Sequence, residues 1–321
     1  MIVVTGAAGF IGSYLVSYLN KLGEDRILLI DKLGTKEKWK NLLGKKFIDF
    51  VDRDYFIGNI ENFKNIKFIF HIGACADTTE LNLDYLMKIN FEYSKKLFKF
   101  AEEQKIPFIY ASSAATYGAG EYGYCDDVSF IEKLRPLNPY GFSKQIYDEW
   151  VLRQTDKPPF WAGFKFFNVF GPNEYHKGRM ASVIFHAFNQ LKETKKIRLF
   201  KSHREGYSHG EQKRDFVYVH DVCKVLSFFY EKQPKSDIYN LGTGKARTFN
   251  DLANNVIKYS KIDGQIEYFD MPEDLRGRYQ YFTEADMSKL QSIGYDKDFL
   301  SLEEAIKDYV TNYLTQDYKI F

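Results

Sequence analysis

The stretch Gly6-Ala7-Ala8-Gly9-Phe10-Ile11-Gly12 decides the fold of this chain. It directly follows a short apolar run, Ile2–Thr5, and it opens a segment from Phe10 to Leu22 whose apolar side chains recur at helical spacing. In such a strand–turn–helix, the first glycine permits a tight turn, the second lets a pyrophosphate approach the backbone, and the third lets the helix pack on the strand. The unpaired N–H groups at the start of the helix then favour phosphate. The pattern predicts a dinucleotide-binding unit at residues 2–22.

Short apolar runs and helical patterns alternate through the first half of the chain. The runs lie at 26–30, 67–72, 107–112 and 161–167, and helical spacing covers 86–104 and 140–153. Strands this apolar are usually buried on both faces, as in a parallel sheet covered by helices. The alternation therefore predicts an α/β fold with a doubly wound, Rossmann-type parallel sheet.

The pattern changes after Phe170-Gly171-Pro172, where the chain becomes more polar and less regular. No low-complexity linker separates the two parts, so we expect later residues to interleave with the core. We expect residues 1–170, with returns from about 213–243, to form the dinucleotide-binding domain. Residues 171–321 should mainly form a smaller α/β substrate-binding domain.

Composition excludes several classes of protein. The 321 residues are 45% hydrophobic and 27% charged, and the net charge is only +2, which is ordinary for a globular enzyme and gives no electrostatic footprint for nucleic acid or a membrane surface. No apolar run approaches the ~20 residues that span a bilayer. The three cysteines lack metal-ligand spacing and suit a reducing compartment. We therefore expect a cytoplasmic protein without a metal site.

An acidic residue, Asp31, closes the second predicted strand at the interval typical of dinucleotide-binding units. Its carboxylate could accept hydrogen bonds from an adenosine ribose, which favours NAD. Lys32, Lys36, Lys38 and Arg53 lie where they could instead hold a 2′-phosphate. These residues leave the choice between NAD and NADP open.

Tyr140 and Lys144 form a YxxxK pair on a predicted helix. Side chains four residues apart share a helix face, and an adjacent cation favours the phenolate form of tyrosine. Such a pair also occurs by chance, but here Ser113 lies upstream at the carboxyl end of a predicted strand, where ligands sit in such sheets. The three residues predict an acid–base site.

Together these motifs resemble the extended short-chain dehydrogenase/reductase family of nucleotide-sugar enzymes. Narrower blocks are similar to the ADP-L-glycero-D-manno-heptose 6-epimerases of that family: GACADTTE at 73–80, FNVFGPNE at 167–174, HKG at 176–178, MASV at 180–183 and GRYQ at 277–280. The resemblance runs almost end to end. It implies inversion of C6 of the heptose in ADP-D-glycero-D-manno-heptose, with tightly held NADP, for the heptose of the lipopolysaccharide core. It also implies a homo-oligomer, by resemblance a pentamer.

The resemblance also assigns residues. It implies that Ser113, Tyr140 and Lys144 are catalytic, with Lys177 as a second acid/base, although spacing alone would make Lys177 a solvated rim lysine. Implied cofactor contacts are Gly6, Gly9, Phe10, Ile11, Gly12, Asp31, Lys32, Lys38, Arg53, Ile72, Gly73, Ala74, Cys75, Ala76, Asn90, Tyr140, Lys144, Val169 and Lys177. Implied substrate contacts are Ser113, Asn168, Arg179, His186, Phe200, Lys201, Ser202, Arg214 and Tyr279.

Three features depart from the resemblance: Ile72 replaces an expected acidic residue, Arg179 replaces a small one, and the 203–212 loop is longer than usual. A 4-epimerase or a non-catalytic NAD(P)-binding protein are the alternative interpretations. A dehydratase would need an Asp-Glu pair where this chain has Ala114 and Ala115.

Overall fold

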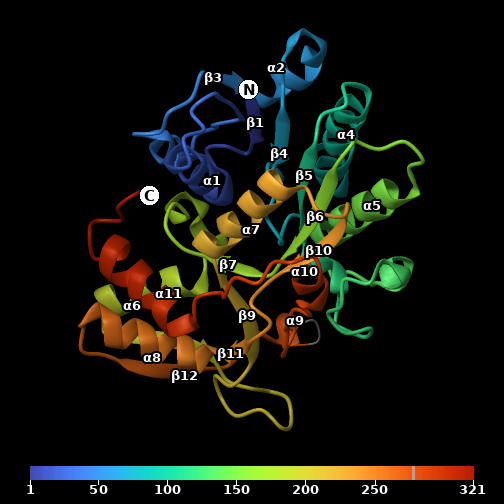
Figure 1. Ribbon diagram of the computed structural model, residues 1–321. Helices are drawn as coiled ribbons and strands as arrows, with labels where there is room; N and C mark the ends of the chain where they lie inside the picture. Colours follow the sequence, from blue (N-terminus) through green and yellow to red (C-terminus); the bar gives the residue numbers. More distant parts are fainter. Residues whose placement is uncertain (277–278) are drawn as a thin grey trace.

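The computed structural model describes residues 1–276 and 279–321. Within these residues, seven parallel strands form the central sheet in the order β10-β6-β5-β4-β1-β2-β3 (Figure 1). The strands are β1 (Ile2–Thr5), β2 (Ile27–Asp31), β3 (Asp49–Asp52), β4 (Phe68–His71), β5 (Phe108–Ser113), β6 (Trp161–Phe166) and β10 (Asp237–Leu241). The strand order reverses between β1 and β4, and a crevice for ligands forms at such a reversal. The predicted doubly wound parallel sheet is confirmed.

Helices cover both faces of this sheet. Helices α1 (Phe10–Lys21) and α7 (Val219–Lys232) lie on one face, and α4 (Tyr93–Glu103) and α5 (Pro139–Arg153) lie on the other (Figure 1). Every residue of β1, β2 and β4 is buried, which accounts for their unbroken apolar sequences. The short helix α2 (Arg53–Gly58) follows β3.

The helical region predicted from residue 86 begins earlier. Helix α3 (Leu83–Leu86) starts after Asn82, whose side chain accepts a hydrogen bond from the Tyr85 N–H and so caps the helix. A π-helical turn, η3 (Met87–Glu92), then joins α3 to α4. Turns of this kind are frequent at functional sites, and this one contains the buried Asn90.

Later residues form two smaller sheets and also re-enter the large one. One sheet has the order β11-β9-β7 and the other pairs β12 with β8. Between them, helices α6, α8 and α11 fill the lower part of the molecule in Figure 1. The bounds are β7 (Asn168–Phe170), β8 (Lys196–Phe200), β9 (Lys213–Tyr218), β11 (Ala246–Thr248), β12 (Gln265–Phe269), α6 (Val183–Thr194), α8 (Phe249–Ser260), α9 (Glu273–Arg276), α10 (Ser288–Ser292) and α11 (Leu302–Tyr309). Because β10 pairs with β6, the chain returns to the central sheet after β9 and α7.

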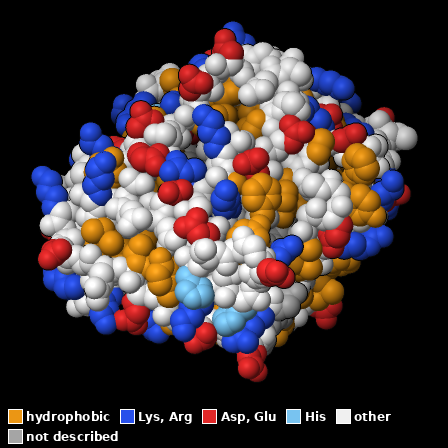
Figure 2. Space-filling view, turned by 90° about the horizontal axis from the view of Figure 1, so that it is seen from below, with side chains coloured by type: hydrophobic (Ala, Val, Ile, Leu, Met, Phe, Trp, Pro, Cys, Tyr) orange, Lys and Arg blue, Asp and Glu red, His pale blue; other side chains and the backbone are white. Residues whose placement is uncertain are grey.

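The surface seen from below carries charges of both signs side by side, with no large area of one sign (Figure 2). This mixture agrees with the net charge of +2. Among residues 1–276 and 279–321, no helix combines the length and the apolar character needed to cross a membrane.

Candidate functional site

A cavity of about 590 Å³ opens at the carboxyl ends of β1, β2 and β4. Most of the residues expected to contact a cofactor line it: Gly6, Gly9, Phe10, Ile11, Gly12, Asp31, Lys32, Lys38, Arg53, Ile72, Gly73, Ala74, Cys75, Ala76 and Lys177. The other four, Asn90, Tyr140, Lys144 and Val169, are not among the lining residues. The structure therefore brings distant sequence segments together at the predicted edge of the sheet.

The glycine turn lies too close to its neighbours for larger side chains. A Cβ on Gly6 would come within 2.6 Å of the Gly73 Cα, and a Cβ on Gly12 within 2.1 Å of the Gly6 carbonyl oxygen. Gly6 also has a φ of 67°, which favours glycine. Gly9 caps helix α1 without any side-chain hydrogen bond, so the first N–H groups of the helix are left for a ligand.

Charged residues gather at the far end of β2. The Asp31 carboxylate accepts hydrogen bonds from the Ala8 N–H at 2.8 Å and the Lys32 N–H at 2.7 Å, and its ion pair with Lys38 measures 2.6 Å. Lys32 and Arg53 both pair with Asp54 and lower the pKa of that carboxyl group. The fourth cation, Lys36, also lines the cavity. Four cations therefore outnumber the three carboxylates of Asp31, Asp52 and Asp54 here, which leaves a small positive excess.

Ser113, Tyr140 and Lys144 meet at the end of β5. Asn138 caps helix α5 by accepting a hydrogen bond from the Gly141 N–H, so Tyr140 lies in the first turn of that helix and Lys144 one turn later. Burial raises the pKa of Tyr140, although a hydrogen bond with Ser113 acts in the opposite direction. Burial also lowers the pKa of Lys144 to about 8. The grouping expected from the YxxxK motif and the upstream serine is thus present.

A buried ion pair that the sequence analysis missed lies behind these residues. Lys165 on β6 and Asp148 on α5 are 2.8 Å apart, with side chains 2% and 0% exposed. The Asp148 carboxylate also accepts hydrogen bonds from the hydroxyl groups of Tyr110 and Ser112. A lysine inside an otherwise apolar strand pattern was the sequence signal for this pair.

Asn90 braces the segment that follows β4. Its side-chain oxygen accepts a hydrogen bond from the Cys75 N–H at 2.8 Å, and its amide group donates to the Cys75 carbonyl and the Ser143 hydroxyl at 3.0 Å each. Asn90 therefore connects a wall of the cavity to helix α5. His71, also near this wall, is hydrogen-bonded to Thr5 and Ser94 and so has a structural role.

Lys177 is half-buried rather than a fully solvated rim residue. Its ammonium group lies 5.2 Å from the centre of the Phe10 ring at the start of α1. Burial lowers the pKa of Lys177, and the nearby Glu174 partly offsets this. The Glu174 carboxylate is completely buried and accepts hydrogen bonds from Ser182 and Tyr309. Spacing alone predicts a solvated lysine, whereas Lys177 lies in the 3₁₀ helix Tyr175–Met180 and lines the cofactor cavity.

Arg214 lies in an aromatic setting away from the glycine turn. Its side chain is buried, and its guanidinium carbon is 5.1 Å from the centre of the Tyr279 ring. Phe200 packs edge-on against Tyr279. No ion pair involving Arg214 occurs among the described residues, and Asp215 instead accepts hydrogen bonds from the N–H groups of the 243–244 turn and of residue 285. Asp215 is therefore not the partner of Arg214 in the described structure.

The other residues expected to contact substrate have varied settings. Lys201 pairs with Asp270 at 3.2 Å, and Arg179 pairs with Asp77 at 3.2 Å, beside the wall of the cofactor cavity. Three more lie on a loop, a strand and a helix: Ser202, whose N–H donates to His209, Asn168, which is exposed at the start of β7, and His186, which lies on α6. Gly277 and Arg278, part of one motif of the resemblance, lie outside the described residues.

The 201–213 loop is tied down by its histidines. His203 and His209 are both exposed, yet the His203 ring accepts a hydrogen bond from the Met271 N–H and the His209 ring accepts one from the Ser202 N–H. These two contacts hold the loop at its solvent-exposed side.

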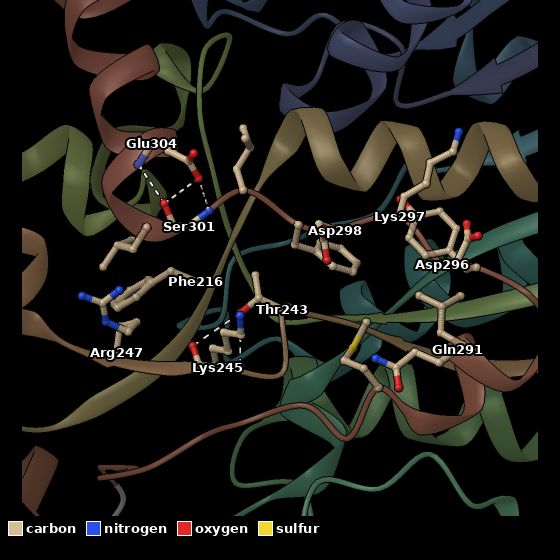
Figure 3. Close-up of a pocket in the computed structure, with 16 residues that line it drawn as sticks. Phe216, Thr243, Lys245, Arg247, Gln291, Asp296, Lys297, Asp298, Ser301 and Glu304 are labelled. Carbon is tan, nitrogen blue, oxygen red and sulfur yellow. Dashed lines mark hydrogen bonds between the residues drawn. The ribbon is translucent and has the colours of Figure 1, made fainter.

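A second cavity, of about 940 Å³, lies between β9, α10 and the segment before α11 (Figure 3). None of the expected site residues lines it. Several of its polar groups already have partners: Arg247 pairs with Asp251 and Glu303, and Ser301 exchanges hydrogen bonds with Glu304. The smaller cavity at the glycine turn is therefore the candidate site, despite its smaller volume.

Comparisons with known proteins show the family to which the chain belongs. The sequence profile of the NAD dependent epimerase/dehydratase family matches residues 2–242. The chain belongs to this family. A protein of Fusobacterium nucleatum named ADP-L-glycero-D-manno-heptose-6-epimerase is 50% identical over 99% of both chains, and one of the same name from Nitratidesulfovibrio vulgaris is 45% identical over 98% of both. The crystal structure of the Helicobacter pylori enzyme of that name superposes with a TM-score of 0.83 at 29% identity, over 97% of this chain and 95% of that one.

Membership of the epimerase/dehydratase family implies a nicotinamide dinucleotide, and the cavity fits one. The glycine turn presents bare backbone, α1 presents uncapped N–H groups, and the end of β2 presents an acidic residue among cations. The segment 72–76 and Lys177 close the remaining sides.

Proposed function

We propose that this chain is an ADP-L-glycero-D-manno-heptose 6-epimerase, which inverts C6 of the heptose in ADP-D-glycero-D-manno-heptose. The observation that carries the proposal is the presence of two separate candidate proton donors, the buried Tyr140 on α5 and the half-buried Lys177 at the cofactor cavity. Relatives of that name at 50% and 45% identity support it.

The proposed cofactor is NADP. Lys32, Lys36, Lys38 and Arg53 supply the positive excess that a 2′-phosphate needs. Asp31, which would favour NAD, already binds Lys38 and the Ala8 N–H. When bound, the dinucleotide supplies reversible oxidation of the sugar at C6.

The side chains of this chain would supply proton transfer and orientation. Tyr140 accepts the proton of the C6 hydroxyl, Ser113 hydrogen-bonds its oxygen, and the ammonium group of Lys144 favours the phenolate. Oxidation of the C6 hydroxyl would give a ketone, and inversion requires that this ketone turn over in the site so that it is reduced on its other face. Its oxygen then points away from Tyr140, and Lys177 provides the second proton donor.

Arg214 would bind the pyrophosphate of the substrate. A buried guanidinium beside aromatic rings matches phosphate geometry in a two-pronged way. On this proposal, residues 1–170 with returns from about 213–243 bind NADP, and residues 171–321 mainly bind substrate. We further propose, from the family resemblance, a cytoplasmic homo-oligomer, a pentamer, that supplies heptose for the lipopolysaccharide core.

The direct test is to incubate purified protein with ADP-D-glycero-D-manno-heptose and follow the configuration at C6 by NMR. An equilibrium mixture of the two C6 epimers is the expected result. Conversion of UDP-glucose to UDP-galactose without C6 inversion would favour a 4-epimerase. Retained cofactor with no turnover of any nucleotide sugar would favour a non-catalytic protein.

A further inference from the structure

Asn41 lies where three segments around the cofactor cavity meet. Its side chain is 3% exposed, and its amide nitrogen lies 3.0 Å from the Ala8 carbonyl oxygen and 2.9 Å from the Asn173 carbonyl oxygen. The same nitrogen lies 3.2 Å from Nδ1 of His176. Asn41 belongs to the 3₁₀ helix η1 (Glu37–Leu42), which also carries Lys38. One amide therefore contacts the glycine turn and the segment that leads to Lys177.

Asn173 extends this connection to helix α1. Its side chain is completely buried, donates to the Ser13 hydroxyl at 3.1 Å and accepts a hydrogen bond from the Phe321 N–H at 3.0 Å. Its φ of 77° is one that few residues other than glycine adopt, although asparagine tolerates it better than most. The Phe321 ring stacks on Tyr14 of α1 at 3.9 Å. Asn173 is thus fixed on both sides.

The segment held by these two amides carries Lys177. The Lys177 N–H donates to the Glu174 carbonyl at 3.0 Å, one residue beyond Asn173. His176, immediately before Lys177, has its pKa lowered by burial to about 4, so its ring is neutral near pH 7 and Nδ1 can accept a hydrogen bond from the Asn41 amide. The position of Lys177 beside Phe10 therefore depends on contacts that begin at residues 41 and 173.

We propose that Asn41 and Asn173 form an amide clasp that positions Lys177 at the cofactor cavity, so that the proton transfer assigned to Lys177 depends on both. The inference rests on the proposed function, because it assigns that role to Lys177. Both asparagines are positioning residues. A small displacement of a proton donor is enough to slow the step that uses it, since a misplacement of about 1 Å can cost roughly 10²-fold.

The test uses Asn41→Leu, which removes the amide at similar size, and Asn173→Gly, which suits the positive φ. Single-turnover oxidation of each C6 epimer of the ADP-heptose is measured with each variant. Lys177→Met first identifies the epimer whose oxidation needs Lys177. Both asparagine variants should slow the oxidation of that epimer at least ~10-fold and change the oxidation rate of the other epimer less than ~2-fold. Equal slowing of both epimers would mean that the clasp only stabilises the fold, and unchanged rates would mean that it does nothing for catalysis.

Asn20→Leu is the matched control. The Asn20 amide also joins two segments, bonding to the carbonyl groups of Glu24 and Lys46, but its hydrogen bonds reach neither the glycine turn nor the segment that carries Lys177. This variant should lower the melting temperature and leave the ratio of the two half-reactions unchanged.

A double variant separates this inference from the proposed function. Asn41→Leu added to Lys177→Met should cause no further loss if Asn41 acts through Lys177, and a further tenfold loss would overturn the clasp. If Lys177→Met oxidises the epimer slowly while Asn41→Leu keeps the wild-type rate, the clasp alone is refuted. Wild-type epimerisation by Lys177→Met would refute the two-donor mechanism and the clasp with it.

Discussion

The ammonium group of Lys144 donates a hydrogen bond to the backbone carbonyl of Ala111, 2.8 Å away. This contact joins helix α5 to strand β5 two residues before Ser113, where the strand ends. It fixes a buried cation beside Tyr140, whose phenolate it would stabilise.

Removing either proposed proton donor should slow epimerisation. Tyr140→Phe and Lys177→Met should each lower kcat at least ~10²-fold, the usual scale for the loss of a positioned acid or base. Tyr147→Phe is the control on the same helix, because its hydroxyl contacts only the Ser94 carbonyl in the described structure. Tyr140→Phe and Lys177→Met should each still oxidise one C6 epimer faster than the other. If Lys177→Met epimerises at the wild-type rate, Tyr140 is the sole acid/base.

Lys144 should make stability depend on pH between about 8 and 10.5. Its pKa falls from an ordinary 10.5 to about 8 in the folded protein, so the unfolded chain binds more protons in this window. The free energy of unfolding should therefore rise with pH in the wild type relative to Lys144→Met, by at most a few kcal/mol. Urea unfolding at pH 7.5 and 9.5 measures this. A constant difference between the two proteins would contradict the lowered pKa.

Lys38→Ala should weaken NADP binding more than NAD binding. The variant removes one of four cations at the cavity and frees Asp31, which can then accept the hydrogen bonds of an unphosphorylated ribose. Lys40→Ala is the control on the same 3₁₀ helix, since Lys40 pairs with Glu37 and does not line the cavity. Mass spectrometry of cofactor released from denatured protein gives the readout. If the denatured wild-type protein releases only NAD, and Lys38→Ala keeps the wild-type activity, then NADP use is refuted.

Arg214→Ala should raise KM for the nucleotide sugar roughly tenfold or more while the protein stays folded. A charge-assisted hydrogen bond is worth about 1.5–3 kcal/mol, and Arg214 pairs with no carboxylate among the described residues. Arg247→Ala provides the contrast: its guanidinium pairs with Asp251 and Glu303, so its loss should lower the melting temperature instead. An unchanged KM in Arg214→Ala would assign that residue to structure.

Asp148→Asn should destabilise the fold by about 3–5 kcal/mol, because it leaves the Lys165 ammonium buried without its counter-charge. The paired change Asp148→Leu with Lys165→Met should cost less than the single change, since it removes both charges together. Urea unfolding of the three proteins tests this order. A smaller loss from Asp148→Asn than from the double change would show that the ion pair matters little.

The sequence predicted features that depend on near neighbours in the chain. Glycine spacing and unbroken apolar runs located β1, α1, β2 and β4, because each follows from local geometry and burial. The spacing of Tyr140 and Lys144 likewise placed both on one face of α5. Family resemblance, not periodicity, pointed to Lys177.

Contacts between residues that lie far apart in the chain could not be predicted from the sequence. Asn41 and Asn173 are 132 residues apart, and neither has a composition signal that points to the other. Lys165 lies in a predicted strand that is otherwise apolar, so its pairing with Asp148 was not predicted. The start of the helical region at Leu83 was missed because the cap at Asn82 is one polar residue in a polar loop.

The pairing of β10 with β6 affects how this protein can be made. Residues 161–166 form an interior strand only once residues 237–241 have been synthesised and have reached the sheet. Until then the growing chain exposes an apolar strand edge, which favours pairing with other chains. A fragment ending near residue 170 would keep that edge exposed permanently and should aggregate. A fragment carrying only the later residues would contain β10 but not the sheet with which this strand pairs. The enzyme should therefore be expressed whole and should not be reconstituted from halves.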